Sequence, residues 1–213
     1  TDQITALKPS QVVSIPTQSM AALTAGQVSA FTAQQVAYLT NSQMGALTSA
    51  QVGALTTDQI PHLKAAQLAA VSTTGLAGLD STQIEAFSAV QIGGLRTEQI
   101  AALATDQIAA IASEDIRGLT RQQIAALQSD QVGNLTSDQL TAFNATQLAA
   151  IETQDLIALS TDNVVALTTE QMAAFTTALS TFTAAFTAFT TTFTAWCVVA
   201  GFAMVICTRF FAA

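Results

Sequence analysis

The sequence predicts an all-α fold: a solenoid of very short helices, one for each eight-residue repeat, followed by one long apolar C-terminal helix. Three observations predict it. The octad T-x-x-Q-[IV]-x-A-L recurs in 21 uninterrupted copies from Lys8 to Phe175. The first and fourth residues of the octad form a helix-capping pattern. The repeat then stops, and phenylalanines at heptad spacing follow it. We therefore divide the chain into residues 1–175, the octapeptide solenoid, and residues 176–213.

The octad itself indicates that the helix is interrupted once per repeat. At ~100° per residue, eight residues of continuous helix rotate by ~800°, which is ~80° beyond two turns. The apolar residues at positions 5 and 8 would then wind around a continuous helix and face no single core. A helix of one and a half turns is marginal alone, because helices under ~12 residues are unstable in water. We therefore expect the repeats to stack on one another.

Position 1 supplies the interruption. It is Thr, Ser, Asp or Asn in 13 of the 21 octads, and these side chains cap helix N-termini. Gln at position 4 is expected to reach back to the cap amide and complete a capping box. Small residues at position 7 are expected to let neighbouring backbones approach closely. Position 4 is Gln in 16 octads, and the exceptions are Ser19, Gly75, Asp115, Asp155 and Asn163.

A β-solenoid is the alternative fold, because Thr, Val and Ile favour strands. The consensus lacks the Gly, Asn or Pro that would turn each coil, and Ala at positions 6 and 7 is poor strand material. The sequence leaves open how many octads make one layer. It also leaves open whether Pro16, Pro61 and the glycines of octad 72–79 mark bends or are tolerated variation.

Residues 171–208 form an uncharged run in which six residues follow the 3-4 spacing of a helix that packs along a partner. We predict that they make oligomerisation or anchoring contacts. They are Leu179, Phe182, Phe186, Phe189, Phe193 and Trp196. From Ala195 the composition becomes more lipid-like, and Cys197 and Cys207 lie in this stretch. Three interpretations stay open for 176–213: a helix that covers the end of the solenoid, a homo-oligomeric bundle, and a membrane anchor.

Composition argues against several functions. Only 9% of residues are charged and the net charge is −8, so the basic stripe of a nucleic-acid-binding protein is missing. We expect no nucleic-acid partner, no cofactor and no metal. His62 is the only histidine, and no Ser–His–acid set or phosphate-binding loop accompanies it. The adjacent acids Glu114 and Asp115 are interpreted as solvated helix-start charges. An enzyme is not expected.

The phrase L-T-x-x-Q-[VI]-x-A-[LI] resembles the opening helix of TAL-effector repeats, but no base-reading loop follows it. The whole array resembles the degenerate L-T-T-x-Q-[IV]-x-A repeats of large bacterial secreted or surface proteins. That resemblance implies an extracellular or cell-surface location and no catalytic residues. We expect a structural repeat protein, a homo-oligomeric subunit of an assembly or filament, with possible membrane contact through 176–213. The alternatives are a protein- or carbohydrate-binding repeat module, or an ice-binding β-solenoid with rows of Thr. A further hypothesis, a membrane-active translocator, is based only on the apolar residues 176–213.

Overall fold

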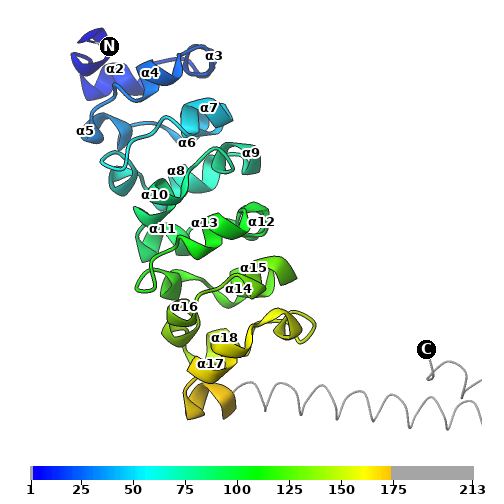
Figure 1. Ribbon diagram of the computed structural model, residues 1–213. Coiled ribbons are helices and arrows are strands. Elements are labelled where there is room, and N and C mark those ends of the chain that lie inside the picture. The colour runs from blue at the N-terminus through cyan, green and yellow to red at the C-terminus, as the bar shows by residue number, and fades with distance from the viewer. Residues whose placement is uncertain (1, 174–213) are drawn as a thin grey trace, which may run out of the picture.

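The computed structural model describes residues 2–173, which form a column of stacked turns (Figure 1). Throughout this part of the chain the regular elements are short helices, and no strand is present. The predicted all-α solenoid is confirmed, and the alternative β-solenoid is wrong. The predicted long apolar helix after residue 175 lies outside the described residues.

Each octad from 8–15 to 160–167 contributes one helix of three to six residues, and α1 precedes the first of them. The α-helices are α1 Asp2–Thr5, α2 Pro9–Val13, α3 Thr17–Ala21, α4 Ala25–Val28, α5 Ala33–Val36, α6 Asn41–Gly45, α7 Ser49–Val52, α8 Ala65–Ala70, α9 Thr73–Leu76, α10 Ser81–Glu85, α11 Ala89–Gly93, α12 Thr97–Ala102, α13 Thr105–Ala109, α14 Arg121–Ala125, α15 Ser129–Gly133, α16 Ser137–Ala142, α17 Ala145–Leu148 and α18 Thr161–Ala166. Three octads form 3-10 helices instead: η1 Ile60–His62, η2 Ile116–Gly118 and η3 Leu156–Ala158.

The predicted capping box starts most of these helices. Thr40 has an extended backbone, with φ −76° and ψ 158°, and precedes α6. Its hydroxyl accepts a hydrogen bond from the Gln43 backbone N–H at 3.2 Å, and Gln43 Oε1 accepts one from the Thr40 N–H at 2.7 Å. Two of the donors left free at a helix start are thereby satisfied. Where position 1 cannot cap, as at Ala104, the Gln half of the box remains.

The two prolines at irregular octads have different effects. Pro16 occupies the position before α3 with φ −61° and ψ 146°, a backbone conformation that proline adopts without strain. Pro61 lies inside its octad, where it lacks the N–H that an α-helix needs. Its octad forms the 3-10 helix η1, as two octads without proline also do. Both prolines are accommodated within one octad, and the column continues past them.

The stacking pattern gives the length of one turn. Helix α6 packs against α8, α7 against α9 and α16 against α18, and each of these pairs is three octads apart. The glutamine at position 4 instead bonds to carbonyls 28 and 31 residues earlier, in the octad four repeats before its own. One turn of the superhelix therefore contains between three and four octads, which the sequence left open.

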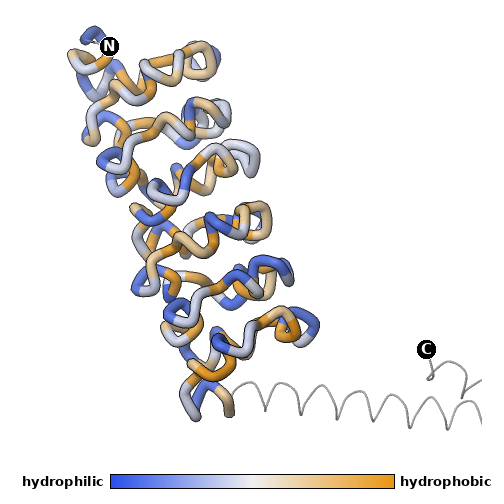
Figure 2. The backbone as a smooth tube through the Cα atoms, in the orientation of Figure 1, coloured by the Kyte–Doolittle hydropathy of each residue, from blue (hydrophilic) through white to orange (hydrophobic). Residues whose placement is uncertain are grey.

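Positions 5 and 8 fill the interior of the column. The position-5 residue is buried in every octad from Val12 to Leu148, and position 8 is buried from Phe31 to Ile151. These side chains form one continuous hydrophobic cluster. Figure 2 shows the corresponding alternation of hydrophobic and hydrophilic residues along the chain. Burial of this apolar stripe stabilises helices that would be too short to persist alone.

At two pairs of octads, 48–55 with 72–79 and 88–95 with 112–119, glycines allow neighbouring turns to approach more closely than side chains would permit. A Cβ on Gly53 would lie 2.4 Å from the carbonyl oxygen of Gly78, and one on Gly93 would lie 2.6 Å from that of Gly118. A Cβ on Gly118 would in turn lie 2.0 Å from the carbonyl oxygen of Ala89. Gly78 and Gly118 stand at position 7, so the prediction that small residues there let neighbouring backbones approach is confirmed. Gly53 and Gly93 show that small residues at position 6 do the same.

Candidate functional site

The recurring glutamine at position 4 is the functional group that the repeat uses most, and its function is to join turns. While Oε1 accepts from the cap amide of its own octad, Nε2 donates to backbone carbonyls of the octad four repeats earlier. We call this two-sided arrangement the glutamine clamp. Fourteen buried glutamines form it: Gln35, Gln43, Gln51, Gln59, Gln67, Gln83, Gln91, Gln99, Gln107, Gln123, Gln131, Gln139, Gln147 and Gln171.

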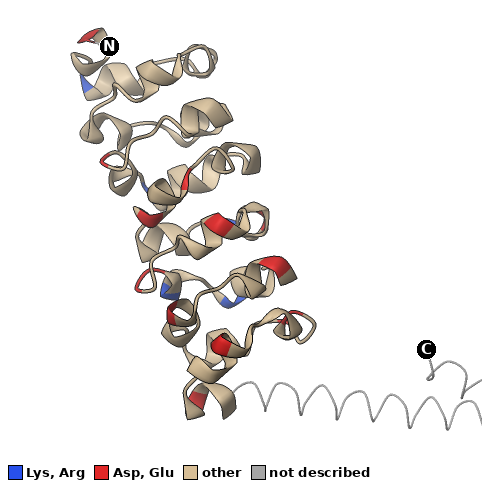
Figure 3. Ribbon diagram, in the orientation of Figure 1, with Lys and Arg blue, Asp and Glu red and all other residues tan. Residues whose placement is uncertain are grey.

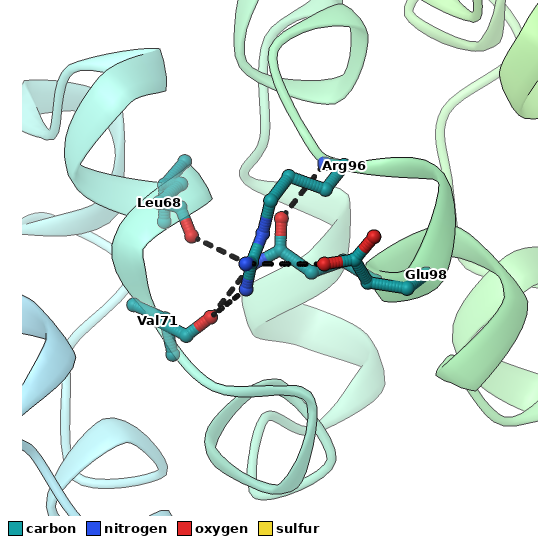
Figure 4. A network of polar contacts seen from close by, with 5 residues as sticks. Leu68, Val71, Arg96 and Glu98 are labelled. Carbon is teal, nitrogen blue, oxygen red and sulfur yellow. Dashed lines mark hydrogen bonds and ion pairs between the residues drawn. The ribbon is translucent and has the colours of Figure 1, made fainter.

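The clamp at Gln99 shows the geometry in detail (Figure 4). Gln99 is fully buried. Its Nε2 donates to the carbonyl oxygens of Leu68 at 3.0 Å and Val71 at 2.7 Å, and its Oε1 accepts from the Arg96 N–H at 2.8 Å. The side chain of Arg96 adds a bond to the Val71 carbonyl at 3.3 Å and an ion pair with Glu98 at 3.1 Å. Because Arg96 and Glu98 are exposed, this pair adds little stability.

Sequence reasoning found only half of this role. The capping bond is local and follows from the T-x-x-Q spacing. The bonds to the preceding turn have backbone carbonyls as acceptors, and any residue type supplies those. An amide was needed for both tasks, because it carries an acceptor and two donors on one planar group. The preference for Gln over Glu at position 4 was the available signal, since a carboxylate completes a capping box equally well.

Among the octads from residue 32 onward, three have no amide side chain at position 4, and in two of these an acid bridges a different pair of turns. Their position-4 residues are Gly75, Asp115 and Asp155, which are 40 residues, or five octads, apart. Asp115 Oδ1 accepts from the Ala89 N–H at 2.7 Å, at the start of α11 three octads earlier. Asp155, which is buried, accepts from the hydroxyl of Ser129 at the equivalent position. A carboxylate suits the exposed amides at a helix start.

Octad 160–167 combines both arrangements. Asn163 Nδ2 donates to the carbonyl oxygen of Leu135 at 2.9 Å, 28 residues earlier, as a clamp glutamine does. Asn163 Oδ1 accepts from the Ser137 hydroxyl at 3.1 Å, 26 residues earlier, as the aspartates do. The amide of Asn163 therefore joins its octad both to the octad four repeats earlier and to the octad three repeats earlier.

The outer surface of the column becomes acidic toward its C-terminal end (Figure 3). Residues 1–79 contain two acidic and two basic residues, whereas residues 80–173 contain twelve acidic and three basic ones. The exposed acids at position 3 begin their helices, and the helix dipole favours a negative charge there. They are Glu98, Asp106, Asp130, Asp138, Asp162 and Glu170, whereas the exposed Glu114 lies two residues before η2.

Asp80 is the acid whose surroundings change its ionisation. The hydroxyl of Thr82 donates to its carboxylate at 2.7 Å, and the Gln83 backbone N–H donates at 2.8 Å. These bonds favour the charged form and lower the pKa of Asp80 below its usual value of 3.8. Asp80 is therefore a structural N-cap in its ionised state.

Two shallow, open grooves lie between successive turns. The larger, about 510 Å³, is lined by Arg121, Gln122, Ala125, Ala149 and Ala150. The smaller, about 350 Å³, has Glu85 and Asp138 among its lining residues, together with the backbone around Ala109–Ser113. Neither groove brings together a nucleophile, a base and an oxyanion donor set.

The residues weighed as catalytic or metal-binding remain apart. His62 is exposed in η1. Glu114 is exposed to solvent, whereas the neighbouring Asp115 binds the start of α11. Across residues 2–173, no three His, Cys, Asp or Glu side chains gather in a group that could hold a metal ion.

In the last described turn, position 5 of the octad is no longer buried. Ile151 is the final fully buried apolar residue of the column. Val164 and Met172 occupy the normally buried position 5, yet they are 40% and 37% exposed. Ile157 and Val165, at position 6 of adjacent octads, are 89% and 78% exposed. The resulting surface, which we call the open last turn, consists of these four residues.

The six residues predicted to make oligomerisation or anchoring contacts, Leu179 to Trp196, lie outside the described residues. Their contacts remain a prediction, as does the boundary at residue 175. Among the helices of residues 2–173, none has the length and apolar character to cross a membrane.

Comparison with known proteins identifies the repeat. No curated protein matches the chain. Four segments, residues 35–65, 61–97, 108–145 and 148–181, match the ALTTAQ repeat. Each match spans about four octads, which is the separation that the glutamine clamp bridges. Since the four segments together cover more than half of the sequence, the chain belongs to the ALTTAQ repeat family.

Proposed function

We propose that this protein is a structural subunit of an extracellular or cell-surface assembly, in which the octad column is the body and residues 176–213 make the self-association or anchoring contact. The observation that carries this proposal is that the recurring residues are used in building the column. The clamp glutamines are buried and bonded on both sides. The capping residues and the apolar positions 5 and 8 likewise serve the fold.

The surface that is left over supports a passive role. Thr, Ser, Gln and Ala dominate the outer positions, and they offer no strong nucleophile or proton-transfer pair. A solenoid of nearest-neighbour contacts is extended and regular, so it suits a spacer or a building block. The uncharged run 171–208 stands next to this body. Its phenylalanine spacing is typical of a helix packed along a partner, which favours a homo-oligomer.

The test compares the full chain with a variant of the tail. Light scattering and negative-stain microscopy of the wild type are expected to show oligomers or filaments. Trp196→Ser combined with Val199→Ser, in the most apolar part of the tail, is expected to release monomers, whereas Val90→Ser, at an exposed position on the column, should leave the assembly unchanged. A wild-type chain that is monomeric and binds no phospholipid vesicles would refute both the assembly and the anchoring roles.

A binding module is the second candidate, and the acidic surface of residues 80–173 favours it. Twelve acids against three bases in this part of the column give a field that attracts cationic partners. Such binding should weaken steeply as salt is raised. Pull-down of a polylysine probe at low and at high salt distinguishes this role from the structural one, because a purely structural column needs no such affinity.

A further inference from the structure

The open last turn differs from every other level of the column. Position 5 is fully or almost fully buried in octads from Val12 to Leu148, because another turn covers it. In octads 160–167 and 168–175 the same position is more than one third exposed. Ile157 and Val165, at position 6 of octads 152–159 and 160–167, are exposed as well, so the last three octads expose four large apolar side chains. Solenoids need a terminal cover over such a surface, because it is otherwise a site of association.

The sequence after this turn does not continue the repeat. In octad register, position 4 of the next repeat would be Leu179, which cannot form a glutamine clamp. Positions 5 and 8 would be Ser180 and Thr183, which cannot extend the apolar core. A further octad turn is therefore excluded as the cover. Yet the chain leaves the column at this same surface, since Met172 belongs to it.

We propose that residues 176–193 of the same chain cover the open last turn. Three observations favour this occupant. The segment begins next to the surface, so a short connection gives it a high effective concentration there. It carries no charge, so its burial has no ionic desolvation cost. It supplies Phe182, Phe186, Phe189 and Phe193 at helical spacing, and these aromatic side chains can bury large apolar areas.

This inference goes beyond the proposed assembly role and divides the tail in two. Residues 176–193 close the column, and the more apolar stretch from Ala195 to Cys207 remains for self-association or anchoring. The same arrangement explains why the phenylalanine spacing begins where the octads end. The covering segment replaces the missing turn, and the assembly contact lies farther along the chain.

The test uses three matched variants of the full chain: Ile157→Glu, Val165→Glu and, as control, Val90→Glu. All three wild-type side chains are at least 76% exposed in the column, so none of the substitutions breaks its core. Hydrogen exchange at residues 152–173 is measured in dilute solution. We expect Ile157→Glu and Val165→Glu to raise exchange rates in this region by about tenfold, because a buried charge would displace the cover. Val90→Glu should leave them unchanged.

Two results would overturn the proposal. Equal exchange in all three variants would mean that the open last turn faces solvent in the full chain. Faster exchange that depends on protein concentration, with loss of oligomers, would mean that a second copy supplies the cover. The exchange experiment tests a contact within one chain, whereas the assembly proposal concerns contacts between chains. A negative exchange result would therefore not refute the assembly proposal. Failure of the assembly test would likewise leave this one standing.

Discussion

Clamped octads and the three clamp-free octads 72–79, 112–119 and 152–159 hold neighbouring turns together by different means. At a clamped octad, a long buried amide reaches the octad four repeats earlier. At each clamp-free octad, the backbone comes into direct contact with the backbone of the octad three repeats earlier. The small residues Gly and Ala at the contact allow this close approach. The short side chains of Asp115 and Asp155 then bond to the start of the neighbouring helix or to the serine there.

The two means are coupled in the sequence. Each clamp-free octad packs on an octad that has glycine at position 6, namely Gly53, Gly93 or Gly133. Both sets recur every 40 residues. Two periods are therefore superimposed in the sequence. The eight-residue period defines the individual helices, and the period of five octads defines where neighbouring turns come closest.

The largest effect is expected from removing one clamp donor. Gln99→Glu keeps the oxygen that accepts from the cap amide. It replaces the Nε2 group, which donates to the carbonyls of Leu68 and Val71, with a buried, negatively charged oxygen. We expect the free energy of unfolding to fall by about 3 kcal/mol or more, as measured by urea denaturation.

Gln27→Glu is the matched control for this change. Gln27 forms the same capping box with Thr24 but is partly exposed, and within residues 2–173 its side chain bonds only to its own octad. Its substitution should cost under about 1 kcal/mol. Equal losses at Gln99 and Gln27 would mean that glutamine serves only as a cap.

The second effect concerns the close approach of turns. Gly118→Ala places a methyl group 2.0 Å from the carbonyl oxygen of Ala89, and the backbone must move to make room. A loss of about 1–3 kcal/mol is expected. Gly26→Ala is the control, because a Cβ there meets nothing within 4 Å. Since alanine favours helix over glycine, this control should stabilise the chain by up to about 1 kcal/mol. Thermal unfolding of both variants compares them directly.

A third substitution tests whether the clamp-free octads are designed or merely degenerate. Asp115→Gln restores the consensus, yet it removes the carboxylate bound to the Ala89 amide and adds a methylene where turns are close. We expect a loss of about 1–2 kcal/mol. Ser19→Gln restores the consensus in the first described turn, where residues 2–173 offer no carbonyl four octads earlier, and should be neutral. If Asp115→Gln stabilises the chain in chemical denaturation, the octad is simply degenerate.

The smallest effect is the pH dependence at Asp80. Its pKa is lowered in the folded chain, so the ionised cap contributes stability at pH values above the ordinary carboxyl range. That contribution is lost as the pH falls through the lowered pKa. Asp80→Asn keeps a capping oxygen without the charge, and its stability should vary less between pH 5 and pH 2 in parallel denaturation curves. Identical pH profiles for the two chains would contradict a charged cap.

Local chemistry made much of the fold predictable from sequence. The break in each octad, the cap at position 1 and the buried positions 5 and 8 depend on residues within one repeat, and all three predictions are confirmed. The turn length was not predictable, because it depends on bonds from glutamine to backbone carbonyls 28 to 31 residues away. Every residue type has a backbone carbonyl, so the sequence does not show which carbonyls accept these bonds.

The clamp-free octads could have been found from the sequence. The position-4 exceptions Gly75, Asp115 and Asp155 are evenly spaced, and their spacing is five octads. Treated one at a time they resemble random variation, and only their common register reveals a second period. The candidate contact residues from Leu179 to Trp196 lie beyond the described column, so their role rests on heptad spacing and on the experiments above.

Whether glutamine joins each turn to the octad four repeats earlier can be measured by nuclear Overhauser effects from a single side-chain amide. We expect the Nε2 protons of Gln99, which is fully buried, to show contacts to Leu68 and Val71 and to exchange slowly with solvent. Contacts confined to its own octad, together with rapid exchange of that amide, would show that Gln99 acts only as a local cap.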